Sequence, residues 1–221
     1  HNPPHEIHVW VQTQPKDSDG KPINVRYGDM PSEVKKAVKE HLLQEQGYLC
    51  CYTGMRINEE KSHIEHFKPQ CKCGNSQEDI DYRNMFAAYP SGDGERALFG
   101  AHKKGNWWPE TYESHLLISP LEPTCEKRFK FKLSGRVEPA DPAAAQMIDI
   151  LGLNEKELQR LRRSAIRTYL RFDAGSNKKS GKPPITISRL QQISEQFCHR
   201  NQHTGAFNEF CYVIQQAALE L

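Results

Sequence analysis

The chain has 221 residues, of which 37% are hydrophobic and 26% charged, and its 30 basic and 28 acidic residues give a formal net charge of +2. This composition predicts a globular protein with its own core and excludes collagenous, coiled-coil and low-complexity chains. No apolar run approaches the roughly 20 residues that a membrane-spanning helix requires, so we expect no membrane association. The seven cysteines are not spaced as even pairs, which favours reduced thiols and a cytoplasmic location.

In chain order, residues 1–30 show little periodicity and are predicted to form an extended arm. A helix is predicted from Ser32, where apolar residues recur at helical spacing, to a C-cap at Gly47. Residues 48–57 and 63–67 are rich in strand formers and are predicted to pair as a hairpin. The sequence further predicts a helix over 79–88 and two helical turns over 101–108, stopped by Pro109.

The rest of the chain is predicted to be a hairpin followed by helices. Residues 128–137 alternate apolar and polar around a Ser134-Gly135 turn, which indicates the hairpin. Amphipathic patterns predict helices over 142–151, 155–172, 187–200 and 206–219, and residues 174–184 are predicted to be a basic linker. The predicted divisions are an N-terminal arm and helix (1–47), a core with the following hairpin (48–137) and a helical C-terminal region (138–221).

Residues suited to phosphodiester hydrolysis gather in the segments HIEHFKP, YRNMF and GAHKKGNW. Glu65 and His66 end a predicted strand, and Asn84 lies in the connection that follows. His102 and Asn106 are four residues apart on a predicted helix, where they would share one face.

The residue types indicate the chemistry. A neutral imidazole, with an ordinary pKa of about 6.5, can take a proton from water, so His66 is the candidate general base and Asn84 the residue that orients it. Glu65, His102 and Asn106 are the candidate ligands of one divalent ion that would stabilise charge on the phosphate. Their mixed oxygen and nitrogen donors favour Mg²⁺ or Mn²⁺. We expect His63 to be structural or to tune the site from behind.

Together with LCCYTGMRI and the later SPLEPTCEKRFKF, these blocks resemble the HNH endonucleases, and specifically the nuclease subunit of Septu-type antiphage systems, also found beside retrons. The resemblance covers about residues 1–170. It implies an α+β fold in which a ββα-metal nuclease core lies between an N-terminal helix and a mainly helical C-terminal region. It also implies an ABC-type ATPase subunit as partner, a retron RNA–DNA complex as a further partner, and a role in antiphage defence.

The chain departs from the resemblance at the structural zinc site that many such proteins carry. Thr53 stands where the cysteine paired with Cys50 would be, and Tyr89 and Gly100 replace the second pair. Structural Zn²⁺ is therefore not expected. A regrouping of cysteines around zinc is the open alternative, and it would use Cys50, Cys51, Cys71 and Cys73.

A basic stretch between residues 155 and 190 has ten Lys or Arg against three acidic residues. It predicts either a surface that contacts nucleic-acid phosphates or a solvated helix face. DNA is the favoured substrate, and RNA, including tRNA, stays open because the motif carries no base readout. The alternative function is a non-catalytic interaction subunit that uses a degenerate HNH scaffold. The candidate nucleic-acid-binding residues are Lys103, Lys104, Arg162, Arg163, Arg167, Lys178, Lys179 and Lys182.

Overall fold

The structure is a computed structural model, and it describes residues 2–92, 97–170 and 185–221. The secondary structure consists of α-helices, β-strands and short 3₁₀ helices, which are labelled η. In chain order they are α1 (His5–Gln12), η1 (Tyr27–Asp29), α2 (Ser32–Glu45), β1 (His63–His66), α3 (Gln70–Cys73), η2 (Tyr82–Asn84), β2 (Met85–Ala88), α4 (Ala101–Lys104), η3 (Thr111–Leu116), η4 (Cys125–Arg128), β3 (Phe129–Phe131), β4 (Val137–Pro139), α5 (Pro142–Ile150), α6 (Lys156–Leu170), α7 (Ile187–Gln196) and α8 (Cys211–Leu219).

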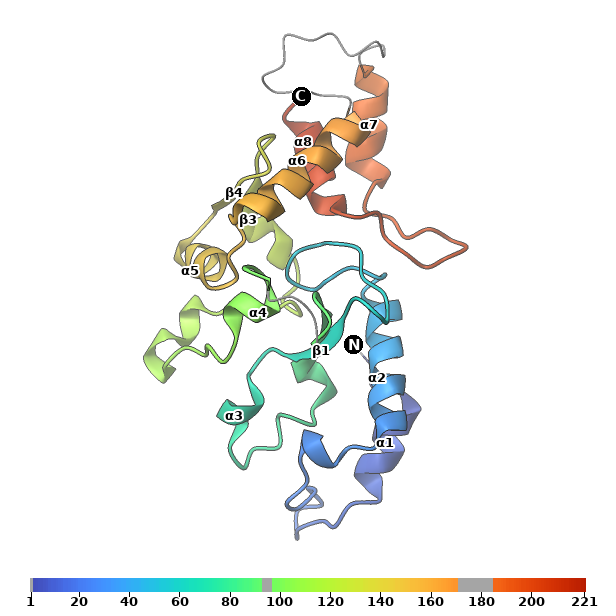
Figure 1. Ribbon diagram of the computed structural model, residues 1–221, viewed down its shortest axis with the longest axis vertical. Helices are drawn as coiled ribbons and strands as arrows, with labels where there is room; N and C mark the ends of the chain where they lie inside the picture. Colours follow the sequence, from blue (N-terminus) through green and yellow to red (C-terminus); the bar gives the residue numbers. More distant parts are fainter. Residues whose placement is uncertain (1, 93–96, 171–184) are drawn as a thin grey trace.

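The elements are arranged along one long axis (Figure 1). Helices α1 and α2 lie at one end, helices α6, α7 and α8 lie at the other, and β1 and α4 lie between them. Helices and two small antiparallel sheets together make an α+β fold, as the sequence predicts.

The N-terminal arm is partly helical, contrary to the extended conformation predicted for residues 1–30. Ile7 and Trp10 are three residues apart in α1, and both are buried in one cluster with Val38 and Leu42 of α2. A helix this short is marginal in water on its own, so the tertiary contact with α2 is what stabilises it.

The central hairpin pairs β1 with β2, whereas the prediction paired it with residues 48–57. Glu65 lies opposite Phe86 and His66 opposite Met85, while the earlier segment closes on itself through an isolated bridge between Leu49 and Arg56. The helix predicted over 79–88 is therefore wrong. All of β2 is buried, so its sequence MFAA shows no alternation, and Met and Ala are good helix formers.

Helix α4 is a single turn and ends earlier than predicted. Gly105 adopts a φ of 52°, a left-handed conformation that ends the helix after Lys104. The helix predicted over 101–108 is therefore too long, and the expectation that His102 and Asn106 share one helix face fails with it.

The second hairpin and the C-terminal helices confirm the predicted pattern. β3 pairs with β4 in antiparallel register. Asp141 begins α5 by accepting a hydrogen bond from the Ala144 N–H, and Arg128 pairs with it at 2.8 Å (Nε to Oδ2). Helix α7 ends at Gln196, earlier than predicted, and α8 begins at Cys211, later than predicted. The predicted linker at 174–184 lies outside the described residues.

Buried side chains form two clusters, one around α5, α6 and α8 and the other around α1, α2 and β2. Cys51, Tyr52 and Tyr89 pack against both clusters, so the segments on either side of the central hairpin join them. Within residues 2–92, 97–170 and 185–221, no helix has the length and apolar character needed to cross a bilayer.

Candidate active site

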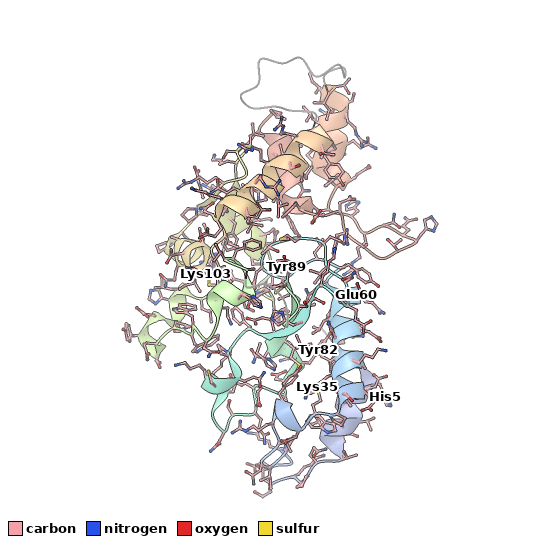
Figure 2. The ribbon with its side chains drawn as sticks, in the orientation of Figure 1. His5, Lys35, Glu60, Tyr82, Tyr89 and Lys103 are labelled. Atoms are coloured by element: carbon pink, nitrogen blue, oxygen red, sulfur yellow. The ribbon has the colours of Figure 1, made fainter. Side chains whose placement is uncertain are left out.

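Strand β1 carries the polar residues of the site on both of its faces. Successive strand residues point to opposite faces, so His63 and Glu65 share one face and His66 lies on the other. Glu65 accordingly contacts α4, and His66 contacts the connection between β1 and β2. Tyr89, just after β2, and Lys103, on α4, are labelled in Figure 2 and locate this region among the side chains. Glu65 and His66 are adjacent in sequence, but their side chains thus lie in different environments.

Glu65 is almost buried and is held by two donors. Lys104 Nζ donates to Glu65 Oε1 at 2.8 Å, and the Tyr52 hydroxyl donates to the same oxygen at 3.1 Å. Burial favours the neutral acid, but the contact with His63 and the charge of Lys104 outweigh it, so the pKa of Glu65 lies below its ordinary value. Glu65 is therefore a carboxylate at neutral pH.

His63 completes this face of β1. Its Nδ1 bonds the Pro90 carbonyl, and its Nε2 lies 3.6 Å from Glu65 Oε2. Burial opposes the charged form, but the contacts with Glu65 and Pro90 outweigh it and raise the pKa of His63. The sequence predicts that His63 is structural or tunes the site from behind, and its proximity to Glu65 fits the second of these roles. Its spacing of two from Glu65 on a strand is the signal that places both on one face.

His66 is buried, with 5% of its surface exposed, and its ring nitrogens have different partners. Nε2 lies 2.9 Å from the Asp79 carbonyl oxygen, which only accepts, so Nε2 carries the proton. Nδ1 then has the lone pair and accepts from the Gln70 side-chain amide at 3.3 Å. Burial lowers the pKa of His66, although the Asp79 carbonyl opposes the shift. His66 is thus a neutral imidazole whose basic nitrogen is Nδ1.

Asn84 fixes the backbone around His66 rather than touching its ring. The Asn84 amide donates to the carbonyls of Lys68 and Glu78, each at 3.0 Å, and its oxygen accepts from the Lys68 N–H at 2.7 Å. Glu78 directly precedes Asp79, whose carbonyl holds His66. Asn84 therefore orients His66 only through the main chain.

The three predicted metal ligands have different surroundings. His102 lies on α4 and its Nδ1 accepts from the Ala97 N–H at 3.2 Å, and its ring centroid is 5.9 Å from that of His63. Asn106 is exposed beyond the end of α4. One oxygen of Glu65 is taken by the ammonium of Lys104.

A metal ion is therefore not accommodated by these side chains as they are arranged. In the part of the chain that the structure describes, no group of three or more His, Cys, Asp or Glu side chains is placed to hold a metal ion. All seven cysteines are free thiols. Any ion at Glu65 has to contend with the Lys104 ammonium.

The predicted nucleic-acid-binding residues divide by burial. Lys103 on α4 and Arg163 and Arg167 on α6 are exposed. Lys104 and Arg162 are buried, which contradicts the expectation that they contact phosphates. Lys178, Lys179 and Lys182 lie outside the described residues.

Arg162 has a structural role that its sequence pattern conceals. Its Nη1 donates to the Leu153 carbonyl at 2.6 Å and the Gly135 carbonyl at 3.4 Å, and its guanidinium lies 5.1 Å from the Phe131 ring centroid. Burial lowers the pKa of Arg162 to about 9. Arg162 joins α6 to the second hairpin.

No protein-family model matches the chain. A protein of Vibrio cholerae serotype O1 biovar El Tor, named "Retron Vc95 putative HNH endonuclease", is 29% identical over 147 residues, which cover 62% of this chain and 67% of that protein. The resemblance to the HNH endonucleases is confirmed. Within this HNH-like chain, the β1–β2 hairpin and α4 carry three of the blocks on which the resemblance rests, HIEHFKP, YRNMF and GAHKKGNW.

Proposed function

We propose that the chain is an HNH-type nuclease that hydrolyses phosphodiester bonds in nucleic acid with His66 as the general base. The observation that carries the proposal is the fixed tautomer of His66. The Asp79 carbonyl holds the proton on Nε2, and burial keeps the ring neutral, so Nδ1 is ready to accept a proton near pH 7.

The first chemical step follows from this arrangement. A water molecule replaces the Gln70 amide at Nδ1, which is feasible because Gln70 is exposed. His66 takes the proton of that water as its oxygen attacks the phosphorus. The phosphorus–oxygen bond to the leaving sugar breaks in the same displacement, and the leaving oxygen takes a proton from solvent. Asn84 keeps the Asp79 carbonyl in place through Glu78, so the ring does not turn when Nδ1 is protonated.

The substrate and partners are part of the same proposal. DNA is the proposed substrate, with RNA or tRNA as the alternative, and the exposed Lys103, Arg163 and Arg167 are the proposed phosphate contacts. The resemblance supports an ABC-type ATPase partner and a role in antiphage defence. The name of the Vibrio cholerae relative supports a retron setting, and the free thiols support a cytoplasmic location.

The divalent ion stays a prediction of the sequence. Mg²⁺ or Mn²⁺ would stabilise charge on the phosphate when bound. Glu65, His102 and Asn106 do not assemble a site for it, so we assign the ion no step.

The experiment is cleavage of supercoiled plasmid and of total tRNA by the purified chain, with Mg²⁺, Mn²⁺ or EDTA. We expect plasmid to be cut in a reaction that EDTA stops. Cutting of tRNA alone would change the substrate class. If neither substrate is cut by the chain, alone or with the ATPase subunit, the proposal fails.

Two observations favour a second candidate, the non-catalytic interaction subunit. His66 is buried and Glu65 is paired with Lys104, as expected of a scaffold whose polar residues serve only the fold. This function predicts that His66→Ala leaves complex assembly and cellular activity unchanged, which a phage-infection viability assay measures.

A further inference from the structure

Lys104 is a buried cation that the proposed mechanism does not use. Only 1% of its side chain is exposed, so the ammonium cannot contact a substrate phosphate. Its Nζ donates to Glu65 Oε1 at 2.8 Å and to the His66 carbonyl at 3.2 Å. The ammonium thus lies where a side-chain oxygen and a main-chain oxygen of β1 converge.

These two acceptors are of the kind that divalent cations prefer. Carboxylate and carbonyl oxygens are the usual protein ligands of hard ions. The Lys104 ammonium already neutralises the Glu65 carboxylate, and His63 Nε2 lies 3.6 Å from its second oxygen. A divalent ion that approaches Glu65 therefore meets a compensated carboxylate and a fixed positive charge beside it.

We propose that Lys104 is a built-in counter-cation of Glu65 that competes with a divalent ion for this carboxylate. The inference rests on the proposed function, because that function is the reason to expect an ion at Glu65. The wild-type chain is then a weak ion binder, and ion loading requires the Lys104 ammonium to leave Glu65.

The local backbone is suited to such a movement. Helix α4 is a single turn, and glycines with positive φ flank it, Gly100 at 69° and Gly105 at 52°. A short segment between two such residues can reorient without disturbing a longer helix.

The first test is a calorimetric titration of Mn²⁺ into the full chain. Lys104→Met should bind Mn²⁺ tighter than the wild type by roughly tenfold or more, because the competing charge is gone. Lys103→Met, the matched change at the exposed neighbour, should bind as the wild type does. The double variant Lys104→Met with Glu65→Gln should lose the gain. Equal affinities of Lys104→Met and wild type, or a gain that survives Glu65→Gln, overturn the proposal.

A second test uses the wild-type chain, because Lys104→Met leaves an uncompensated buried carboxylate and can fail to fold. An amine-acylating reagent is applied with and without Mn²⁺, and modification is read by peptide mass spectrometry. Acylation of Lys104 should rise severalfold with Mn²⁺ while that of Lys103 does not. Unchanged protection of Lys104 at saturating Mn²⁺ overturns the proposal.

The inference and the proposed function fail in different ways. If Mn²⁺ affinity and Lys104 protection show no competition while His66-dependent cleavage persists, only the inference is lost. If competition is measured but cleavage does not depend on His66, only the proposed function is lost.

Discussion

At the residue scale, the two adjacent residues that end β1 have opposite electrostatic surroundings. Glu65 faces Lys104 and His63 and is kept charged, whereas His66 faces a carbonyl and an amide and is kept neutral. Strand alternation produces this separation, because it turns neighbouring side chains toward different faces. The Glu65 carboxylate and the His66 imidazole thus do not form an ion pair with each other.

The pH dependence of cleavage should report the neutral form of His66. Its folded-state pKa is lowered, so the competent neutral imidazole is lost only as pH falls below the ordinary histidine value of about 6.5. We therefore expect a rate that is flat near neutrality and falls on the acid side below that value. Initial rates measured between about pH 5 and 8 test this. A fall that begins above the ordinary value contradicts the assignment.

Asn84 and Asn106 should respond very differently to replacement by alanine. Asn84→Ala removes three main-chain hydrogen bonds and should lower the free energy of unfolding by about 1–3 kcal/mol, with loss of cleavage. Asn106→Ala, at an exposed position, should change neither. Urea denaturation and the cleavage assay measure both effects. If folded Asn106→Ala loses cleavage, the prediction is wrong and Asn106 takes part in the site.

At the element scale, the amphipathic helices were predictable and the central strands were not. The periodicity of α2, α5 and α6 depends on one buried stripe, which a single sequence shows directly. β2 is buried on both faces and is separated from its partner β1 by residues 67–84 rather than by a tight turn, so nothing local marks it. The same distinction between local pattern and tertiary contact applies to the site. His66 and Glu65 were found by residue type, but Lys104 and the Asp79 carbonyl join the site only through tertiary contacts.

Helix α6 supplies a matched pair of arginines that separates structure from binding. Arg162→Ala leaves two carbonyls without their donor and a cavity beside Phe131, so it should lower the free energy of unfolding by about 2–4 kcal/mol. Arg163→Ala, at the exposed neighbour, should change stability by less than about 0.5 kcal/mol.

Binding of labelled DNA at several salt concentrations completes this comparison. Arg163→Ala should weaken affinity and reduce the slope of log affinity against log salt by about 0.9 for one lost phosphate contact. Folded Arg162→Ala should keep the wild-type slope. The reverse assignment of the two effects would contradict the burial of Arg162.

At the scale of the whole molecule, the C-terminal segment returns to the N-terminal helix. Arg200 donates to the Gln44 carbonyl at 2.8 Å and also bonds the Glu45 carbonyl, so it caps the end of α2. The Phe207 N–H donates to the Gly47 carbonyl at 3.0 Å. Residues distant in sequence thus hold the segment between α7 and α8 against the end of α2, which no local pattern could predict.

Removal of the Arg200 hydrogen bonds should destabilise the end of α2. Arg200→Ala should lower the free energy of unfolding by about 1–2 kcal/mol and speed hydrogen exchange at the end of α2. Arg189→Ala is the matched control, because the Arg189 side chain is exposed and donates to Gln192 of its own helix. Identical denaturation midpoints for the two variants would show that the contact contributes nothing.

The most direct test of the nuclease assignment compares the initial cleavage rates of His66→Ala, His203→Ala and the wild type on the substrate that the wild type cuts. His203 is an exposed histidine far along the chain and serves as the matched control. We predict that His66→Ala loses about 100-fold or more of the rate while it still binds the nucleic acid, and that His203→Ala cuts normally. A folded His66→Ala chain that cuts at the wild-type rate would contradict the account.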